Sequence, residues 1–304
     1  MTLSSALLRL LVFPGLVYAV PAAWFFLWVE RKAVARMQQR IGPPLLQPFY
    51  DFMKLLGKRA PPRPGLEGAL TRAWPVLAAA SAAGAVGLLP VLPGAGGFAG
   101  DLVLLLALLE LPAIFLIAAG FSSRSLYGQI GSAREAVMGI SYNLVFLSAV
   151  LAIALAQHTF RLDGLAQPSA SPLRWLGVAA ILLCLPAKLH VTPFSLPNAE
   201  QEIYAGALTE YAGPELALWE LAHGLEWVAM TGLVAALVVP PLGPGPVQGL
   251  IFVAVSALVV LGLSALAAAT ARVTIERATR FYWRAALVVV VVGAGASLLM
   301  GFAR

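Results

Sequence analysis

The sequence predicts an all-α integral membrane protein with about eight transmembrane helices and one amphipathic helix at the membrane surface. Of 304 residues, 60% are hydrophobic and 11% are charged, and the mean hydropathy is +0.87. A soluble domain has about 25% charged residues, so this chain lacks the charge that would cover a water-facing surface. Its apolar residues gather in long runs, and its basic residues gather between alternate runs.

Eight apolar runs account for most of the chain. A helix needs roughly 20 apolar residues to cross the hydrocarbon core of a bilayer, and the runs cover about residues 5–29, 73–92, 102–121, 136–157, 173–189, 214–239, 247–271 and 285–302. The first run is too long for a signal peptide and has denser positive charge after it than before it, so we expect it to be retained. Because we find no internal repeat, the sequence predicts a single polytopic domain over residues 1–304.

Proline and glycine support the boundaries of these runs. Pro75 and Pro214 fall in the first turn of the second and sixth predicted helices, where a missing N–H group is tolerated. Clusters of Pro and Gly separate the second run from the third and the sixth from the seventh. The single cysteine, Cys184, provides neither an internal disulfide nor an iron–sulfur or zinc site. We therefore expect this chain to bind no metal.

The basic residues predict the orientation in the membrane. Of 20 Lys and Arg residues, 16 lie on one side of the predicted helices, including nine between Arg31 and Arg72, and 4 lie on the other side. The positive-inside rule places the richer side in the cytoplasm and both termini outside. This topology also accounts for the net charge of +6 without a nucleic-acid partner, because the charges are spread along cytoplasmic helix ends.

The first cytoplasmic segment contains a predicted amphipathic helix over about residues 48–58. Phe49, Phe52, Met53 and Leu56 are spaced i, i+3, i+4 and i+7, which places them on one face of a helix, and Pro48 suits its first position. Such a helix lies in the plane of the membrane interface. It is either an anchor on the lipid surface or a platform for a cytoplasmic partner. The partner is favoured by four neighbouring basic residues, Arg31, Lys32, Arg36 and Arg40.

Acidic residues concentrate where topology does not require them. Six of the 14 carboxylates fall in one stretch of 27 positions: Glu200, Glu202, Glu210, Glu215, Glu220 and Glu226. Glu226 follows Pro214 by 12 residues, so it lies roughly 18 Å into the sixth helix. His223 shares that half of the helix, and Glu110 lies in another apolar run. Carboxylates at such depth normally face a protein interior or a water-filled path, so the pattern predicts a proton path.

Some of these residues also fit simpler roles. Glu215 lies in the first turn of its predicted helix, where a carboxylate offsets the helix dipole. Glu200 and Glu202 fit solvated loop positions, and His223 fits a neutral hydrogen-bonded histidine as well as a proton relay. We assign no role to His158 and His190, which fall near predicted membrane boundaries.

Three segments resemble the NADH dehydrogenase subunit 1 family, which supplies a membrane subunit of respiratory complex I in bacteria and mitochondria. The first comprises residues 30–43, ERKAVARMQQRIGP, with LLQP at 45–48 and KLL at 54–56. The second is Ser122-Ser123 followed by Ile140-Ser141-Tyr142. The third comprises residues 193–202, PFSLPNAEQE, and 209–213, TEYAG, and is similar to the acidic loop of the family. The resemblance extends over nearly the whole chain, in order.

Departures from quinone-reducing members indicate a particular branch of that family. Those members have several more residues between Ile-Gly-Pro and Leu-Leu-Gln-Pro, a glutamate at the position of Asn143 and an arginine at the position of Glu215. Conversely, Arg134-Glu135, Glu220 and Phe281-Tyr282-Trp283 resemble the corresponding subunit of group 4 [NiFe] membrane-bound hydrogenases and formate hydrogenlyases. The shorter loop argues against a quinone cavity.

The resemblance implies a membrane-anchor and proton-path subunit in a prokaryotic cytoplasmic membrane. It implies hydrogenase-like large and small subunits and an iron–sulfur subunit on the cytoplasmic side, and antiporter-like subunits in the membrane. Those partners would carry the [NiFe] centre and [4Fe-4S] clusters, and this chain would bind no cofactor itself. The predicted proton path comprises Glu110, Glu135, Glu200, Glu202, Glu210, Glu215, Glu220, His223 and Glu226. The predicted docking residues are Arg31, Lys32, Arg36, Arg40, Arg277 and Arg280. Alternatives are the quinone-site subunit of an NADH–quinone oxidoreductase and a stand-alone ion-coupled transporter.

Overall fold

A computed structural model of the chain describes residues 15–60, 65–91, 98–167, 171–197, 200–239 and 245–302. Within those ranges the regular structure is helical and no strand occurs, which confirms the all-α class. The elements are α2 (Leu16–Met37), α3 (Gln47–Leu56), α4 (Gly65–Leu88), α5 (Asp101–Ser122), α6 (Leu126–Gln157), α7 (Leu162–Leu165), α8 (Pro172–Lys188), α9 (Glu200–Ile203), the 3-10 helix η1 (Gly206–Glu210), α10 (Pro214–Val238), α11 (Gly245–Ala269) and α12 (Ile275–Phe302).

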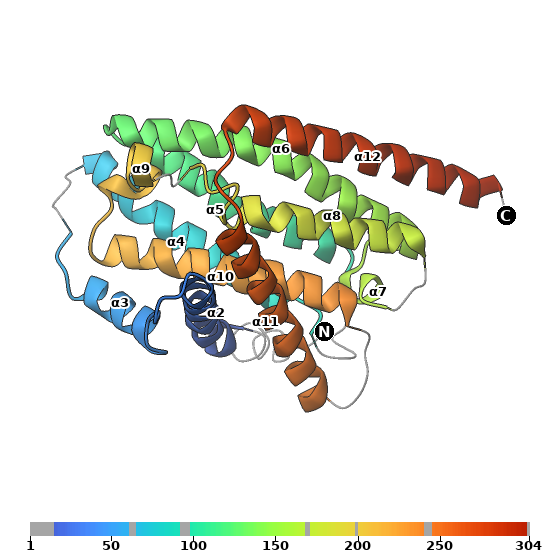
Figure 1. Ribbon diagram of the computed structural model, residues 1–304, viewed down its shortest axis with the longest axis horizontal. Coiled ribbons are helices and arrows are strands. Elements are labelled where there is room, and N and C mark those ends of the chain that lie inside the picture. Colours follow the sequence, from blue (N-terminus) through green and yellow to red (C-terminus); the bar gives the residue numbers. More distant parts are fainter. Residues whose placement is uncertain are drawn as a thin grey trace.

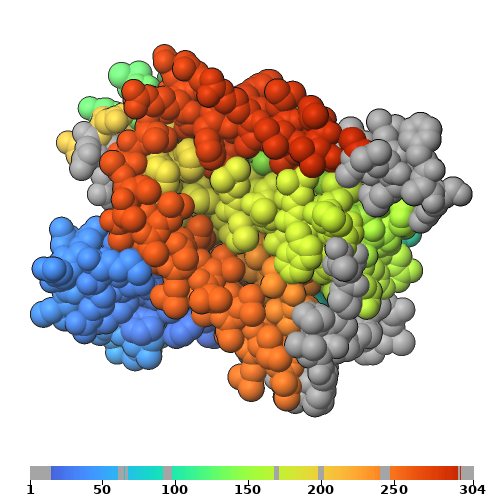
Figure 2. Space-filling view, turned by 45° about the vertical axis from the view of Figure 1, so that its right-hand side comes forward, coloured from blue at the N-terminus to red at the C-terminus, as the bar shows by residue number. Residues whose placement is uncertain are grey.

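The long helices form a bundle in which sequence-distant helices are neighbours. Helix α4 packs against α5 and α10, α6 packs against α8 and α12, and α2 packs against α10 and α11 (Figure 1). Helices α3 and α9 lie at the same end of the bundle, on the left of Figure 1. In Figure 2 the blue segment that contains α2 and α3 lies at one edge of the molecule.

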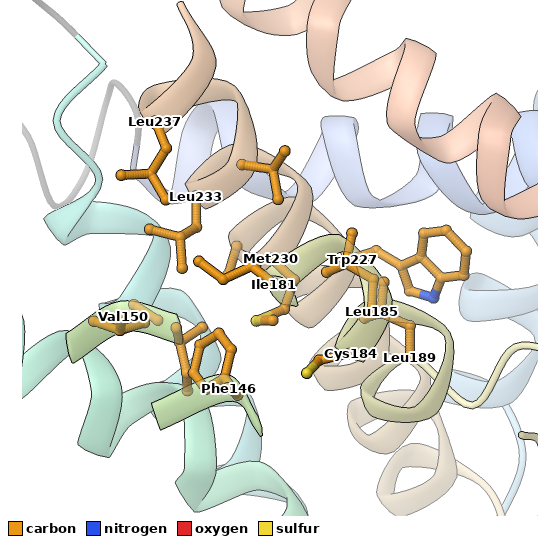
Figure 3. Packing of buried hydrophobic residues seen from close by; sticks show 14 of the residues in the cluster. Phe146, Val150, Ile181, Cys184, Leu185, Leu189, Trp227, Met230, Leu233 and Leu237 are labelled. Atoms are coloured by element: carbon orange, nitrogen blue, oxygen red, sulfur yellow. The ribbon is translucent and has the colours of Figure 1, made fainter. Parts of the chain in front are cut away.

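The centre of the bundle is an apolar contact of three helices. Phe146 of α6, Cys184 and Leu185 of α8, and Met230 of α10 point toward one another (Figure 3) and are fully buried. Within a membrane, lipid tails are as apolar as these side chains, so close packing rather than exclusion of water holds such helices together. Gly177 of α8 permits that packing, because a Cβ there would lie 2.5 Å from the side chain of Ile153 on α6.

Four of the described helices are long and apolar enough to cross a membrane by length and composition. They are α5, α6, α10 and the Val247–Ala269 part of α11. The remaining long helices, α2, α4, α8 and α12, coincide with other predicted runs. The total of eight spans therefore stays a prediction.

Four helices extend beyond the apolar runs. Helix α4 begins at Gly65 rather than 73, so Pro75 lies inside the helix and not in its first turn as predicted. We expected the charges of Glu30-Arg31-Lys32 to end the first helix, but α2 continues to Met37. Glu, Arg and Lys are good helix formers, so the chain stays helical beyond the apolar run. Helix α6 begins at Leu126 rather than 136, where the Ser125 hydroxyl caps it by accepting from the Gly128 N–H. Helix α12 begins at Ile275 rather than 285. Helix α3 agrees with the predicted amphipathic helix to within two residues.

Several sequence predictions lie outside the described residues. They concern residues 5–14 of the first run, residue 92 at the end of the second, residue 240 next to the sixth, residues 198 and 199 of the acidic loop, and both chain termini. The side of the membrane on which the termini lie therefore stays a prediction.

One close approach positions the loop between α8 and α10. A Cβ on Gly131 of α6 would lie 2.8 Å from the Gly206 Cα atom and 2.9 Å from the Ala207 nitrogen of η1. A real Cβ atom does not approach backbone so closely, so only glycine allows η1 to lie against α6 here. Gly206 itself has φ +53°, which also favours glycine.

We expect Gly131→Ala to displace η1 and to lower the free energy of unfolding by about 1–3 kcal/mol. The thermal midpoint of the purified complex in detergent measures this effect. Gly139→Ala, on the same helix, is the matched control, because the nearest atom to its Cβ would be the Tyr142 Oη at 3.9 Å. Equal midpoints for the two variants would contradict the close approach.

Candidate functional site

A partly open cavity of about 200 Å³ lies between the helices. It is lined by residues of α2, α5, α6, α8 and α10 together with η1 and the segment after α8. Its polar lining combines acids and bases: Arg31, Glu135, Lys188, His190, Glu220, His223 and Glu226. Its apolar lining includes Leu27, Leu116, Leu208 and Trp219. At ~30 Å³ per molecule, a cavity of this size has room for several waters.

Glu135 and His190 form a buried pair at one side of the cavity. The Nε2 atom of His190 lies 2.9 Å from the Glu135 Oε2, and the Tyr142 hydroxyl donates to the Glu135 Oε1 at 3.4 Å. Glu135 is 1% exposed. His190 follows the end of α8, where burial disfavours imidazolium but the charge and hydrogen bond of Glu135 outweigh it, so the pKa of His190 lies above its ordinary value. The pair therefore holds a proton between a carboxylate and an imidazole.

His223 of α10 faces His190 across the cavity. The two imidazole rings are stacked, with centroids 5.7 Å apart and an interplanar angle of 10°. The indole N–H of Trp227 donates to the Nε2 of His223 at 3.1 Å. An indole N–H is only a donor, so this Nε2 carries no proton, and the proton of the neutral ring is on Nδ1. That Nδ1 lies 3.8 Å from the Glu226 Oε2, a gap that one bridging water spans.

A second ion pair lies beside the first. The Lys188 Nζ donates to the Glu110 Oε1 at 2.7 Å, and the Asn143 side-chain amide donates to the Glu110 Oε2 at 2.5 Å. The side chain of Lys188 is 1% exposed and that of Glu110 is 17% exposed. The Lys188 Nζ also lies 5.5 Å from the centre of the Tyr142 ring. Since Tyr142 binds Glu135, Lys188 connects the two acidic pairs.

Arg31 of α2 lies at the cavity and joins it to α3. One guanidinium nitrogen lies 3.9 Å from the Glu220 Oε2, and another lies 3.2 Å from the Asp51 Oδ2. Glu30, the preceding residue, interacts electrostatically with His223. The charged C-terminal end of α2 thus contributes to the same site.

The structure brings together five of the nine predicted proton-path residues. Glu135, Glu220, His223 and Glu226 line the cavity, and Glu110 is linked to it through Lys188. The other four lie along the loop and the start of α10. Glu200 begins α9, Glu202 is 53% exposed and pairs with Arg134 at 2.5 Å, Glu210 ends η1, and Glu215 lies in the first turn of α10.

The predicted docking residues have two environments. Arg31 is paired within the chain as described above, and the Lys32 Nζ donates to the Pro43 carbonyl at 3.3 Å. Four others are exposed: Arg36 and Arg40 at the end of α2, and Arg277 and Arg280 on α12. A role in docking stays a prediction for all six.

Sequence reasoning misses Lys188 and His190. In the sequence Lys188 counts only as a topological charge, and His190 has no assigned role. The sequence feature that could have identified them is their position in an otherwise apolar stretch close to the acidic loop, since a buried cation needs a carboxylate partner. The partners, Glu110 and Glu135, lie 78 and 55 residues away in sequence, so nothing local identifies them.

The site combines carboxylates, imidazoles and a lysine next to the cavity. Within the described ranges, no group of three or more His, Cys, Asp and Glu side chains is placed to hold a metal ion. Cys184 is fully buried in the apolar core. What the arrangement offers is an ordered series of groups that accept and release protons next to a space for water.

Known proteins agree with this architecture. The family described as NADH dehydrogenase matches residues 10–297. Hydrogenase-4 component C of Escherichia coli (strain K12) is 32% identical over 224 residues, which cover 71% of this chain and 70% of that protein. A chain of the membrane-bound sulfane sulfur reductase, an archaeal respiratory membrane complex, is 25% identical with a TM-score of 0.86, covering 96% of this chain and 99% of that one. The chain therefore belongs to the NADH dehydrogenase subunit 1 family and is a complex I-like membrane subunit.

Proposed function

We propose that this chain is the membrane-anchor and proton-path subunit of a group 4 [NiFe] hydrogenase-type oxidoreductase. It would couple electron transfer in cytoplasmic partners to the translocation of protons or other ions. The observation that carries the proposal is the series Glu135, His190, His223 and Glu226 beside a polar cavity, in which both carboxylates are buried and His223 is half-buried. Buried ionisable groups in a membrane protein are costly and therefore usually functional.

The loop between α8 and α10 would connect the partners to this series. Leu208 of η1 lines the cavity, and η1 packs against α5 and α6. A change of charge or shape at a cytoplasmic redox partner that moves this loop would change the hydration and the field around Glu135 and Glu226. Burial makes the proton affinity of a carboxylate sensitive to such changes. Redox chemistry outside this chain would then load or release protons inside it.

Protons would move between neighbours in single steps. The proton shared by Glu135 and His190 would pass by way of cavity water to the Glu226 carboxylate. The stacked rings keep the two imidazoles parallel, and Trp227 holds His223 in the tautomer whose Nδ1–H faces that carboxylate. Lys188 would balance the carboxylate charge while a proton moves.

The partners would supply the electron chemistry. Hydrogenase-like large and small subunits and an iron–sulfur subunit would dock on the cytoplasmic side and carry the [NiFe] centre and [4Fe-4S] clusters. Antiporter-like subunits would lie beside this chain in the membrane. Exposed Arg36, Arg40, Arg277 and Arg280 would contact the cytoplasmic partners, and both termini would lie outside the cytoplasmic membrane.

Purification of the intact complex tests the assignment. We expect nickel, iron and hydrogenase-like subunits to copurify with this chain. We also expect hydrogen evolution to change the internal pH of proteoliposomes, in a direction set by the orientation of the complex. A sulfane sulfur reductase is the second candidate, supported by the similarity in fold to that complex. Copurification without nickel, together with reduction of sulfane sulfur, would assign the second function instead.

Trp227→Phe is expected to slow ion translocation by about fivefold, because one hydrogen bond of ~1 kcal/mol no longer orders the His223 ring. Proteoliposomes that contain the complex measure this rate against electron transfer. Trp219→Phe is the matched control: Trp219 lines the same cavity, but its indole N–H has no hydrogen-bond partner among the described residues. Equal slowing by both variants would show that indole volume, not the bond to His223, matters.

A further inference from the structure

We propose that the outward face of α3 binds the headgroups of anionic phospholipids in the leaflet at the α9 end of the bundle. The binding face consists of Leu46, Tyr50 and Met53 together with Lys54 and Lys58, and is called the α3 face here. It is separate from the cavity and does not depend on the proposed proton path. The sequence alone left open whether this helix contacts lipid or a protein partner.

One side of α3 is already occupied. Phe49 and Phe52 pack against Trp24 of α2, with ring centroids 5.1 and 5.6 Å away. Taking Phe49 as zero, Met53, Leu46 and Tyr50 follow at roughly 40°, 60° and 100° around the helix. These three side chains are 49%, 53% and 53% exposed. The apolar stripe predicted from sequence is therefore wider than its contact with α2, and its outer part is uncovered within the chain.

The level of α3 in the bundle favours lipid over a cytoplasmic protein. Trp24 belongs to the apolar part of α2, six residues before the first charged residue, Glu30. Farther along α2, the Trp28 indole N–H donates to the carbonyl of Pro43, in the segment that leads into α3. Helix α3 thus lies beside α2 from Trp24 to Arg31, at the border between its apolar part and its charged end. Apolar side chains at that level face the acyl chains near the headgroups.

The charge around α3 fits an anionic surface. Lys54 follows Tyr50 around the helix at roughly 140°, Lys58 lies two residues beyond the end of α3, and both are exposed. Arg36, Arg40 and Arg59 are exposed nearby in sequence. The one carboxylate between Arg31 and Ala60 is Asp51, which is paired with Arg31 and accepts from Gln47. Lysines that border an apolar ridge place their stems along lipid and their ammonium groups at phosphates.

Fluorescence quenching in proteoliposomes that hold the whole complex tests this face. An environment-sensitive nitrobenzoxadiazole probe is attached at Met53→Cys. The native Cys184 is fully buried, and the chain without Met53→Cys shows the background labelling. The probe is quenched with doxyl-labelled phosphatidylglycerol or doxyl-labelled phosphatidylcholine at equal mole fraction, and with iodide from the aqueous phase.

We expect both lipids to quench the probe, phosphatidylglycerol more strongly, and iodide to quench it little. Adding Lys54→Gln and Lys58→Gln should reduce the preference for phosphatidylglycerol by up to about fivefold for each lysine removed. The matched control, Arg284→Gln, removes one exposed charge from α12 at a position with no proposed docking role and should leave that preference unchanged.

Two results would overturn the proposal. Equal quenching by the two lipids would remove the anionic preference. Absence of lipid quenching, with iodide access appearing only after the cytoplasmic subunits are stripped, would assign the face to a protein partner. Hydrogen evolution and translocation in the same vesicles report the proposed function separately, so either hypothesis can fail without the other.

Discussion

Replacing Glu226 with Gln is expected to reduce ion translocation by at least ~100-fold, the scale on which a positioned proton-transfer group acts. Glu226 is 9% exposed, lies 3.8 Å from the Nδ1 of His223 and is the last proton acceptor of the proposed series. Glutamine keeps the size and the hydrogen-bonding capacity of the side chain but cannot take up a proton. The complex should therefore assemble normally and transfer electrons without moving ions.

Two further variants provide translocation rates against which the Glu226→Gln variant is compared. Glu220→Gln should reduce translocation less, because the Glu220 side chain is 43% exposed and already faces Arg31. Glu276→Gln is the matched control: it removes an exposed carboxylate in the first turn of α12, away from the cavity, and should leave translocation unchanged. Proteoliposome measurements normalised to electron-transfer rate compare the three. Full pumping by the Glu226→Gln complex would contradict the proposed path.

Composition and periodicity predicted the helices well because the membrane imposes one strong constraint on each of them. A helix such as α5 carries nearly uniform apolar sequence, so its bounds, Asp101–Ser122, lie within one residue of the predicted run. The constraint weakens where the chain leaves the bilayer. There α2 and α6 continue as helices through charged or polar sequence whose end no hydropathy signal marks.

The sequence predicts the acidic residues of the site but not their basic partners. Glu110, Glu220 and Glu226 stand out because an isolated carboxylate in apolar sequence requires an explanation, and Glu135 follows from the resemblance to the hydrogenase subunits. Their basic partners did not stand out, because Lys188 lies at a helix end, where lysine is ordinary. Only the packing of α8 between α6 and α10 shows that Lys188 and His190 point inward. Pairing between helices depends on tertiary contacts, which a single sequence does not contain.

Removing the Lys188 charge is expected to destabilise the chain strongly. In Lys188→Met, the carboxylate of Glu110 keeps its bond from Asn143 but loses its cation while still largely buried. Breaking a buried ion pair by removing one partner costs about 3–5 kcal/mol. The thermal midpoint of the purified complex and the amount of this chain in membranes should both fall.

The double variant separates stability from function. Lys188→Met combined with Glu110→Gln removes both charges, and replacing a buried pair by neutral groups is often nearly neutral for stability. We therefore expect the thermal midpoint to recover while translocation stays low, because no cation remains beside Tyr142 and Glu135 to balance a moving proton. Translocation that recovers together with the midpoint would show that the pair only holds α5 against α8. A midpoint that stays low would instead show that Lys188 acts on stability through Glu135 rather than through Glu110.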